Sequence, residues 1–174
     1  MLTRIFYTLL LFLVSPLLLF KLYQKKQGKP TFGKRWIEHF GFVTPLSNRQ
    51  TAPIWIHAVS VGESMAIAPM VKKLKSRHPT IPIIVTTTTS TGAEQIKKLG
   101  DIVEHRYMPI DFTWCINGFL KQIKPQVMLI VETELWPNTL NTVHAINIPI
   151  LIINARLSAR SAKRYQKLKP GLPR

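Results

Sequence analysis

The carboxylate best placed for chemistry is Glu63, because it follows a strand-like segment at the point where a helix-like pattern begins. Residues 54–59 form an apolar run rich in β-branched side chains, and a polar turn at residues 60–63 follows directly. In open parallel sheets, loops at the carboxyl ends of the strands hold ligands. We therefore expect Glu63 to act as a general base toward an attacking hydroxyl group, with Gly62 allowing the ligand close to the backbone.

The position of Glu63 also suggests a structural role. The positive end of a helix lowers the pKa of a nearby carboxylate and weakens it as a base. A catalytic Glu63 therefore needs burial or a neighbouring carboxylate to raise its pKa, and Glu132 and Glu134 could provide that repulsion. The spacing alone leaves an equally good alternative, in which Glu63 only stabilises the first turn of the helix.

Polar segments also follow three other strand-like runs. If the sheet is parallel, these segments all meet at one edge, and such a convergence of polar loops is typical of a binding site. The predicted catalytic residue is Glu63, and the predicted substrate-binding residues are Ser60, Gly62, Thr88, Thr89, Ser90, Thr91, Gly92, Glu132, Glu134, Asn154 and Arg156.

Each of these segments has a purely structural alternative. Residues 88–92 offer hydroxyl and N–H groups at a helix start, which suits an anion, but an ordinary Ser/Thr helix cap has the same pattern. Glu132 and Glu134 face the same side of an extended chain, where Arg156 could pair with them, either beside a substrate or as a structural ion pair. His57 lies inside a predicted strand and is interpreted as a core histidine with its hydrogen bonds satisfied.

The alternation of apolar runs and helix-like stretches predicts an α/β fold, a Rossmann-like doubly wound parallel sheet. Solid apolar runs are typical of parallel strands that are buried on both faces. The predicted strands are residues 54–59, 81–87, 103–108 (the weakest), 127–131 and 149–153, and the predicted helices are residues 63–77, 93–99, 111–123 and 138–145. Because Pro69 is unfavourable inside the first helix, that helix should either start late, near Ile67, or bend.

The charge of the chain points to an anionic partner. It has 24 Lys and Arg residues against 8 Asp and Glu, a formal charge of +16, and residues 21–50 and 156–174 each hold seven of the basic groups. Solvated surface charge is the alternative. Nucleic acid is not the expected partner, because no recognised binding motif is present. Cys115 is the only cysteine, and no metal-ligand spacing or phosphate-binding glycine loop occurs, so no metal or cofactor is expected.

The amino-terminal segment is predicted to attach the chain to a membrane. Residues 1–23 are the predicted anchor: residues 5–20 are nearly continuous apolar sequence, interrupted by Thr8 and by Ser15–Pro16, and lysines rather than a cleavage site follow. The positive-inside rule puts the following residues in the cytoplasm, and a helix lying at the interface is the alternative to a spanning helix. Residues 24–50 are predicted as a basic juxtamembrane segment, with a short helix at 34–40.

Four segments together resemble the 3-deoxy-D-manno-octulosonic acid (Kdo) transferases of Gram-negative bacteria. They are WIHAVSVGE at 55–63, TTTTSTG at 86–92, ETELWPN at 132–138 and NARLSARS at 154–161, in the order of that family. The resemblance implies a membrane-associated glycosyltransferase of the GT-B type, with two Rossmann-like domains. It would transfer Kdo from CMP-Kdo to the bisphosphorylated lipid A precursor, in lipopolysaccharide synthesis at the cytoplasmic face of the inner membrane.

The resemblance also implies roles for particular residues. Glu63 would be the general base, Glu132 or Glu134 would assist, and no metal would be required. Members of the family are more than twice as long as this chain, in which residues 51–174 would form the acceptor-side domain and the donor-side domain is absent. We therefore expect a truncated half of the enzyme, as a fragment, as a truncated gene product or as half of a split enzyme with a separately encoded carboxyl-terminal half, or else an inactive membrane-anchored module that binds anionic lipid.

Overall fold

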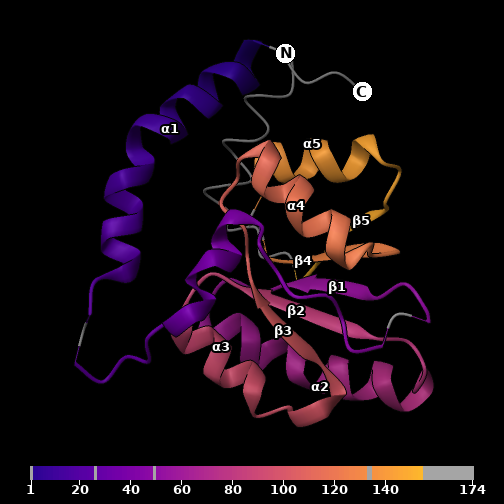
Figure 1. The fold of residues 1–174 in the computed structure, drawn as a ribbon. Helices are drawn as coiled ribbons and strands as arrows, with labels where there is room; N and C mark the ends of the chain where they lie inside the picture. Colours follow the sequence, from indigo (N-terminus) through magenta and orange to yellow (C-terminus); the bar gives the residue numbers. More distant parts are fainter. Residues whose placement is uncertain (1, 26, 49, 133–134, 155–174) are drawn as a thin grey trace, which may run out of the picture.

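The computed structural model describes residues 2–25, 27–48, 50–132 and 135–154, and its centre is a five-stranded parallel sheet (Figure 1). The strands lie in the order β3-β2-β1-β4-β5, and every neighbouring pair is parallel. They comprise β1 Ile54–His57, β2 Ile83–Thr87, β3 Glu104–Tyr107, β4 Val127–Val131 and β5 Ile150–Ile153. The predicted parallel α/β sheet is thus confirmed, with every strand end within two residues of the sequence-based bounds.

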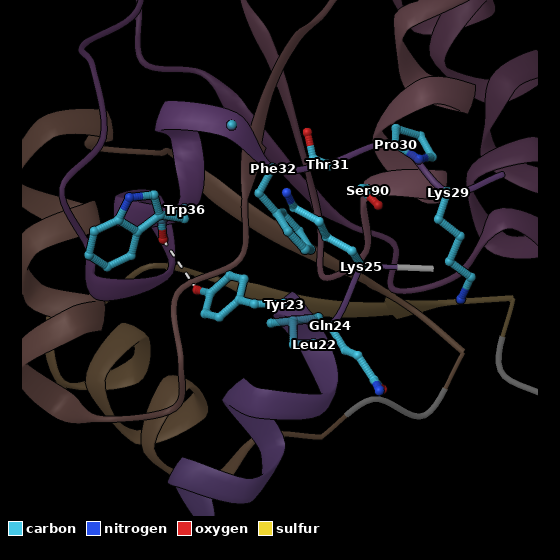
Figure 2. A pocket seen from close by; sticks show the side chains of 11 residues that line it. Leu22, Tyr23, Gln24, Lys25, Lys29, Pro30, Thr31, Phe32, Trp36 and Ser90 are labelled. Carbon is cyan, nitrogen blue, oxygen red and sulfur yellow. Dashed lines mark hydrogen bonds between the residues drawn. The ribbon is translucent and has the colours of Figure 1, made fainter. Parts of the chain in front are cut away.

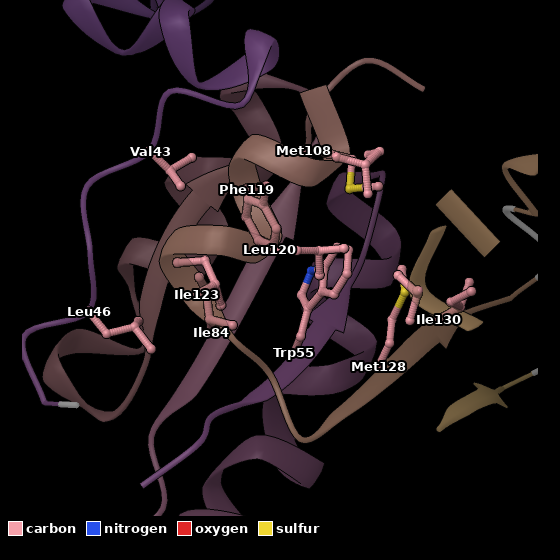
Figure 3. Packing of buried hydrophobic residues seen from close by; sticks show 12 residues of the cluster. Val43, Leu46, Trp55, Ile84, Met108, Phe119, Leu120, Ile123, Met128 and Ile130 are labelled. Atoms are coloured by element: carbon pink, nitrogen blue, oxygen red, sulfur yellow. The ribbon is translucent and has the colours of Figure 1, made fainter. Parts of the chain in front are cut away.

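Helices cover both faces of the sheet, as Figure 1 shows, with α2 and α3 below it and α4 and α5 above. Their bounds are α2 Val61–Arg77, α3 Ser90–Lys97, α4 Thr113–Ile123 and α5 Pro137–Ala145, and a short 3₁₀ turn η2 spans Gly100–Ile102. Neighbouring residues of β1 point to opposite faces: Trp55 packs in the cluster with Phe119 and Met128 (Figure 3), whereas Ile56 packs with Val71 and Val85. Burial on both faces explains why β2 and β4 are apolar or β-branched at every position.

Helix α2 begins earlier than Pro69 suggested. It runs from Val61 to Arg77 with Pro69 inside it, so a late start near Ile67 is wrong. The reason lies at the amino end, where the Ser60 hydroxyl accepts a hydrogen bond from the Glu63 N–H at 3.2 Å and caps the first turn. The first turn is therefore stabilised locally and does not depend on the residues around Pro69.

The segment before the sheet is packed onto the domain. The 3₁₀ helix η1, Gly33–Phe40, buries Glu38 and His39, and the Glu38 carboxylate accepts a hydrogen bond from the Tyr107 N–H at 2.7 Å. Arg106 of β3 donates hydrogen bonds to the carbonyl oxygens of Thr44 and Pro45. Polar groups thus join residues 33–45 to the edge strand β3.

The helix α1, Leu2–Tyr23, is long and apolar enough to cross a membrane, and none of its residues is buried. It lies beside the α/β domain in Figure 1. It contacts α5 through Thr8 and η1 through Tyr23.

Candidate functional site

The carboxyl ends of all five strands lie at one edge of the sheet, because every pairing is parallel. Strand β1 is central, with β2 and β3 on one side and β4 and β5 on the other. The direction of winding therefore reverses next to β1, and ligands of open α/β sheets bind outside the strand ends at such a point. The polar turn that ends in Glu63 follows β1 directly.

Glu63 is 7% exposed, and both of its carboxylate oxygens accept hydrogen bonds. One oxygen accepts from the Val59 N–H at 2.8 Å and the other from the Ser60 hydroxyl at 2.7 Å. Together with the bond from the Glu63 N–H to Ser60, this is a reciprocal cap of the helix start. The structural role considered for Glu63 is therefore present. Each carboxylate oxygen can still accept a further hydrogen bond.

Residues 88–92 form the start of α3, which begins at Ser90 rather than near Ala93. The Thr89 hydroxyl accepts a hydrogen bond from the Gly92 N–H at 3.1 Å, so the helix-cap interpretation of this residue is observed. A Cβ atom on Gly92 would lie 3.1 Å from Thr89 Oγ1 and 3.2 Å from Thr87 Cβ, which explains the glycine. Thr88 Oγ1 is buried and has no hydrogen-bond partner among the described residues.

The loops after β4 and β5 are less fully described. Glu132 and Asn154 adopt the left-handed conformation, with φ of 62° and 53°, so the chain turns sharply at the end of each strand. The Glu132 N–H donates to the Ile153 carbonyl oxygen at 2.9 Å, which brings the two loops together. Glu134 and Arg156 lie outside the described residues, and their pairing stays a prediction.

A basic cleft lies between the end of α1 and the start of α3, on the same side as the carboxyl edge. It comprises two adjoining hollows of about 430 and 300 Å³, which share Lys29, Phe32 and Ser90. Lys25 lines the larger hollow, and Lys21 lines the smaller one. Figure 2 shows Lys25, Lys29, Phe32 and Ser90 around this cleft.

The three lysines bring positive charge next to the amino end of α3, where anions are stabilised. Sequence reasoning counted Lys21, Lys25 and Lys29 in a basic flank but did not place them in a site. The sequence feature that could have indicated this site is the position of the three lysines directly after the apolar run of residues 5–20. Their approach to Ser90 joins segments more than 60 residues apart in the sequence, and no local pattern predicts it.

Three histidines lie close to this edge. His57 is fully buried with Nδ1 3.0 Å from the Thr86 hydroxyl, as expected of a core histidine, but its Nε2 has no partner among the described residues. Burial lowers the pKa of His57 to about 4. Burial, with Arg35 and Arg106 nearby, lowers the pKa of His105 to about 3, and burial also lowers the pKa of His39. These side chains are therefore neutral near pH 7.

The strand order, the helices on both faces and the polar loops along one edge define an α/β protein of the doubly wound, Rossmann-like class. Comparison with known proteins narrows this class. The chain matches the family model of 3-deoxy-D-manno-octulosonic-acid transferases (kdotransferases) over residues 34–173, and it belongs to that family.

Curated relatives agree with this assignment. A 3-deoxy-D-manno-octulosonic acid transferase of Haemophilus influenzae is 42% identical over 170 residues, which cover 97% of this chain and 40% of the relative. A probable mitochondrial 3-deoxy-D-manno-octulosonic acid transferase of Arabidopsis thaliana is 35% identical over 161 residues, 91% of this chain and 36% of the relative. The chain thus spans about two fifths of the length of these relatives.

Proposed function

We propose that this chain is the acceptor-side, Rossmann-like domain of a GT-B-type glycosyltransferase that transfers Kdo from CMP-Kdo to the bisphosphorylated lipid A precursor. The reaction belongs to lipopolysaccharide synthesis at the cytoplasmic face of the inner membrane. Membership of the Kdo transferase family supports the reaction class. The observation that carries the site is the position of Glu63, a carboxylate at the winding reversal beside β1.

In the proposed mechanism, Glu63 takes the proton of an acceptor sugar hydroxyl. The hydroxyl oxygen forms a bond to the anomeric carbon of Kdo, while the bond from that carbon to CMP breaks and CMP leaves with the electron pair. The Val59 N–H and the Ser60 hydroxyl hold the carboxylate in one orientation. A fixed base in hydrogen-bond reach of the attacking group contributes about 10²–10⁴-fold to such a step.

The phosphate groups of the acceptor would be held in the basic cleft. Lys21, Lys25 and Lys29 supply positive charge, and the start of α3 at Ser90 supplies hydroxyl and N–H groups. Glu132, Glu134, Asn154 and Arg156 remain proposed substrate contacts from the loops after β4 and β5. The donor-side domain, which would bind CMP-Kdo, would come from a longer chain or from a separately encoded half. No metal or other cofactor is part of the proposal.

The experiment compares two substitutions in one hydrogen-bonded pair, in the chain joined to a donor-side domain. Glu63→Gln should lower turnover at least about 100-fold, because the base is lost. Ser60→Ala removes the hydroxyl that contacts Glu63 but keeps the carboxylate, and should lower turnover less than about tenfold. Activity of Glu63→Gln within a few-fold of the parent would remove Glu63 from the catalytic role and leave it as a helix cap.

A second candidate function is an inactive, membrane-anchored module that binds anionic lipid. The apolar α1 and the basic cleft beside its end favour it. An assay of the 174-residue chain alone with CMP-Kdo and the acceptor distinguishes the two functions, because it measures both turnover and acceptor binding. Turnover by the chain alone excludes the binding-only function, whereas acceptor binding without turnover fits either this module or a half that needs its donor-side domain.

A further inference from the structure

Helix α1 has two different faces, although its sequence is apolar almost throughout. Residues two positions apart point about 200° away from each other around a helix, so residues 6, 13 and 20 lie opposite residues 8, 15 and 22. We call the first set the outer face: Phe6, Leu13 and Phe20 are 70%, 77% and 70% exposed. The opposite set, the inner face, comprises the half-buried residues Thr8, Ser15 and Leu22.

The inner face contacts the domain along the helix. Near its amino end, the Asn138 amide of α5 donates a hydrogen bond to the Thr8 hydroxyl at 2.9 Å. At its carboxyl end, the Tyr23 hydroxyl lies 3.0 Å from His39 Nδ1. Between them, Ser15 faces a cavity of about 230 Å³ that the helix shares with the strand ends. The Thr8 hydroxyl thus contacts the domain, and Ser15, whose hydroxyl donates to the Phe12 carbonyl oxygen of its own helix, lines the cavity.

These contacts conflict with a helix that crosses a bilayer. Thr8 and Tyr23 are 15 residues apart, or about 22 Å along the axis, and both contact the folded domain. The hydrocarbon core of a bilayer is about 30 Å thick. A crossing helix that kept these contacts would therefore carry the start of α5 deep into the hydrocarbon, together with the buried Asp111 to which Asn138 and Thr139 bond.

The surroundings of the helix match the lipid–water boundary instead. Lys21 lies in the last turn of the helix and Lys25 and Lys29 follow it, and lysines next to an apolar surface are attracted to anionic headgroups. Trp114, at the start of α4, is 56% exposed, and tryptophan side chains favour the interface. Apolar side chains on one face and basic residues at its end are typical of helices that lie in the plane of a membrane.

We propose that α1 does not span the membrane but lies in the plane of one leaflet, with its outer face in the acyl chains of an anionic bilayer and its inner face clamped to α5 and η1. The domain then rests against the membrane, with the carboxyl edge of the sheet beside the headgroups. The proposal depends on the contacts of α1 and is independent of any catalytic role of Glu63.

The test measures how deep three points of the outer face lie in the bilayer. Nitroxide labels are attached at Phe6→Cys, Leu13→Cys and Phe20→Cys in separate variants of the chain, in vesicles of phosphatidylethanolamine and phosphatidylglycerol. The native Cys115 is buried and should not react. Collision with oxygen and with a water-soluble nickel complex then gives the depth of each label, and Ser15→Cys provides the inner-face control.

For a helix in the plane, the three outer labels should lie at one depth within about 4 Å, and the Ser15 label should be less accessible to oxygen. For a spanning helix, the Leu13 label would lie about 10 Å deeper than the other two, since seven residues separate each pair, and that result would overturn the proposal. As a second measurement, Thr3→Cys and Gln27→Cys should react with a membrane-impermeant thiol reagent from the same side of sealed membranes. Reaction from opposite sides would also overturn it.

Discussion

The close approach of Gly41 to α4 allows a sharp test of how residues 33–45 are joined to the domain. Gly41 ends η1 with φ of 83°. A Cβ atom there would collide with the Cys115 carbonyl oxygen and would lie 3.0 and 3.1 Å from the Cys115 carbonyl carbon and Cα. These are backbone atoms of α4, so they cannot rotate away. The substitution to test is Gly41→Ala.

The expected loss of stability has two parts. An alanine in the left-handed conformation costs roughly 1–2 kcal/mol, and forcing extra volume into a packed contact costs about 1–3 kcal/mol more. Gly33 provides the matched control, because it has φ of 55° but nothing within 4 Å of its Cβ position. Gly33→Ala should therefore show only the first part, and Gly41→Ala should be less stable by a further 1–3 kcal/mol or so.

The assay is urea unfolding in mild detergent, followed by tryptophan fluorescence, since Trp55 lies in the core. Gly41→Ala should lower the midpoint more than Gly33→Ala while the slope of the transition stays the same. If the free energies of unfolding of the two variants differ by less than about 0.5 kcal/mol, the contact between η1 and α4 is not formed as described.

Three further predictions concern stability. Asp111→Asn should lower the free energy of unfolding by about 2–3 kcal/mol, measured by urea, because the carboxylate accepts bonds from the Asn138 and Thr139 N–H groups and the Thr139 hydroxyl; a loss below about 0.5 kcal/mol would contradict this. Between pH 7 and pH 5 the histidines of the unfolded chain become protonated near their ordinary pKa of about 6.5. In the folded chain, burial keeps the pKa of His57 at about 4 and that of His105 at about 3, so both side chains stay neutral. As the pH falls from 7 to 5, the free energy of unfolding should therefore decrease by about 2 kcal/mol for each of these two histidines. His57→Gln should accordingly flatten the measured pH dependence, and an unchanged slope would contradict a neutral His57. Ser60→Ala should cost about 1 kcal/mol as a lost helix cap, and unchanged stability would contradict the cap.

The sheet was predictable from the sequence, because most of its strands are short apolar runs that can be recognised without knowing the rest of the fold. Ile83–Thr87 and Val127–Val131 are apolar or β-branched at every position and are buried on both faces. The cap at the amino end of α3 could also be predicted from the sequence, since a threonine three residues before Gly92 has the spacing of a helix N-cap. The predicted start of α2 at residue 63 lies two residues after the observed one, whereas the alternative of a late start near Ile67 is wrong because the cap at Ser60 stabilises the first turn.

The features that sequence reasoning could not reach depend on contacts between distant segments. The basic cleft forms only because Lys21, Lys25 and Lys29 fold back beside Ser90. Likewise, 130 residues separate Thr8 from Asn138, whose amide donates to it. In the sequence, Thr8 only interrupts an apolar run. In the structure, its hydroxyl accepts the hydrogen bond from the Asn138 amide. No periodicity in the chain encodes these approaches.

The measurement that tests most directly whether this domain holds the acceptor is binding of the bisphosphorylated lipid A precursor to the 174-residue chain. The cleft variant carries Lys21→Gln, Lys25→Gln and Lys29→Gln. The matched control removes the same charge from exposed positions on α2 and α3, as Lys72→Gln, Lys73→Gln and Lys97→Gln. Acceptor binding in the cleft predicts that the cleft variant binds at least about tenfold more weakly, and that the control changes the affinity less than about twofold. Equal losses in the two variants would contradict it, because they would show that only the overall charge of the chain attracts the lipid.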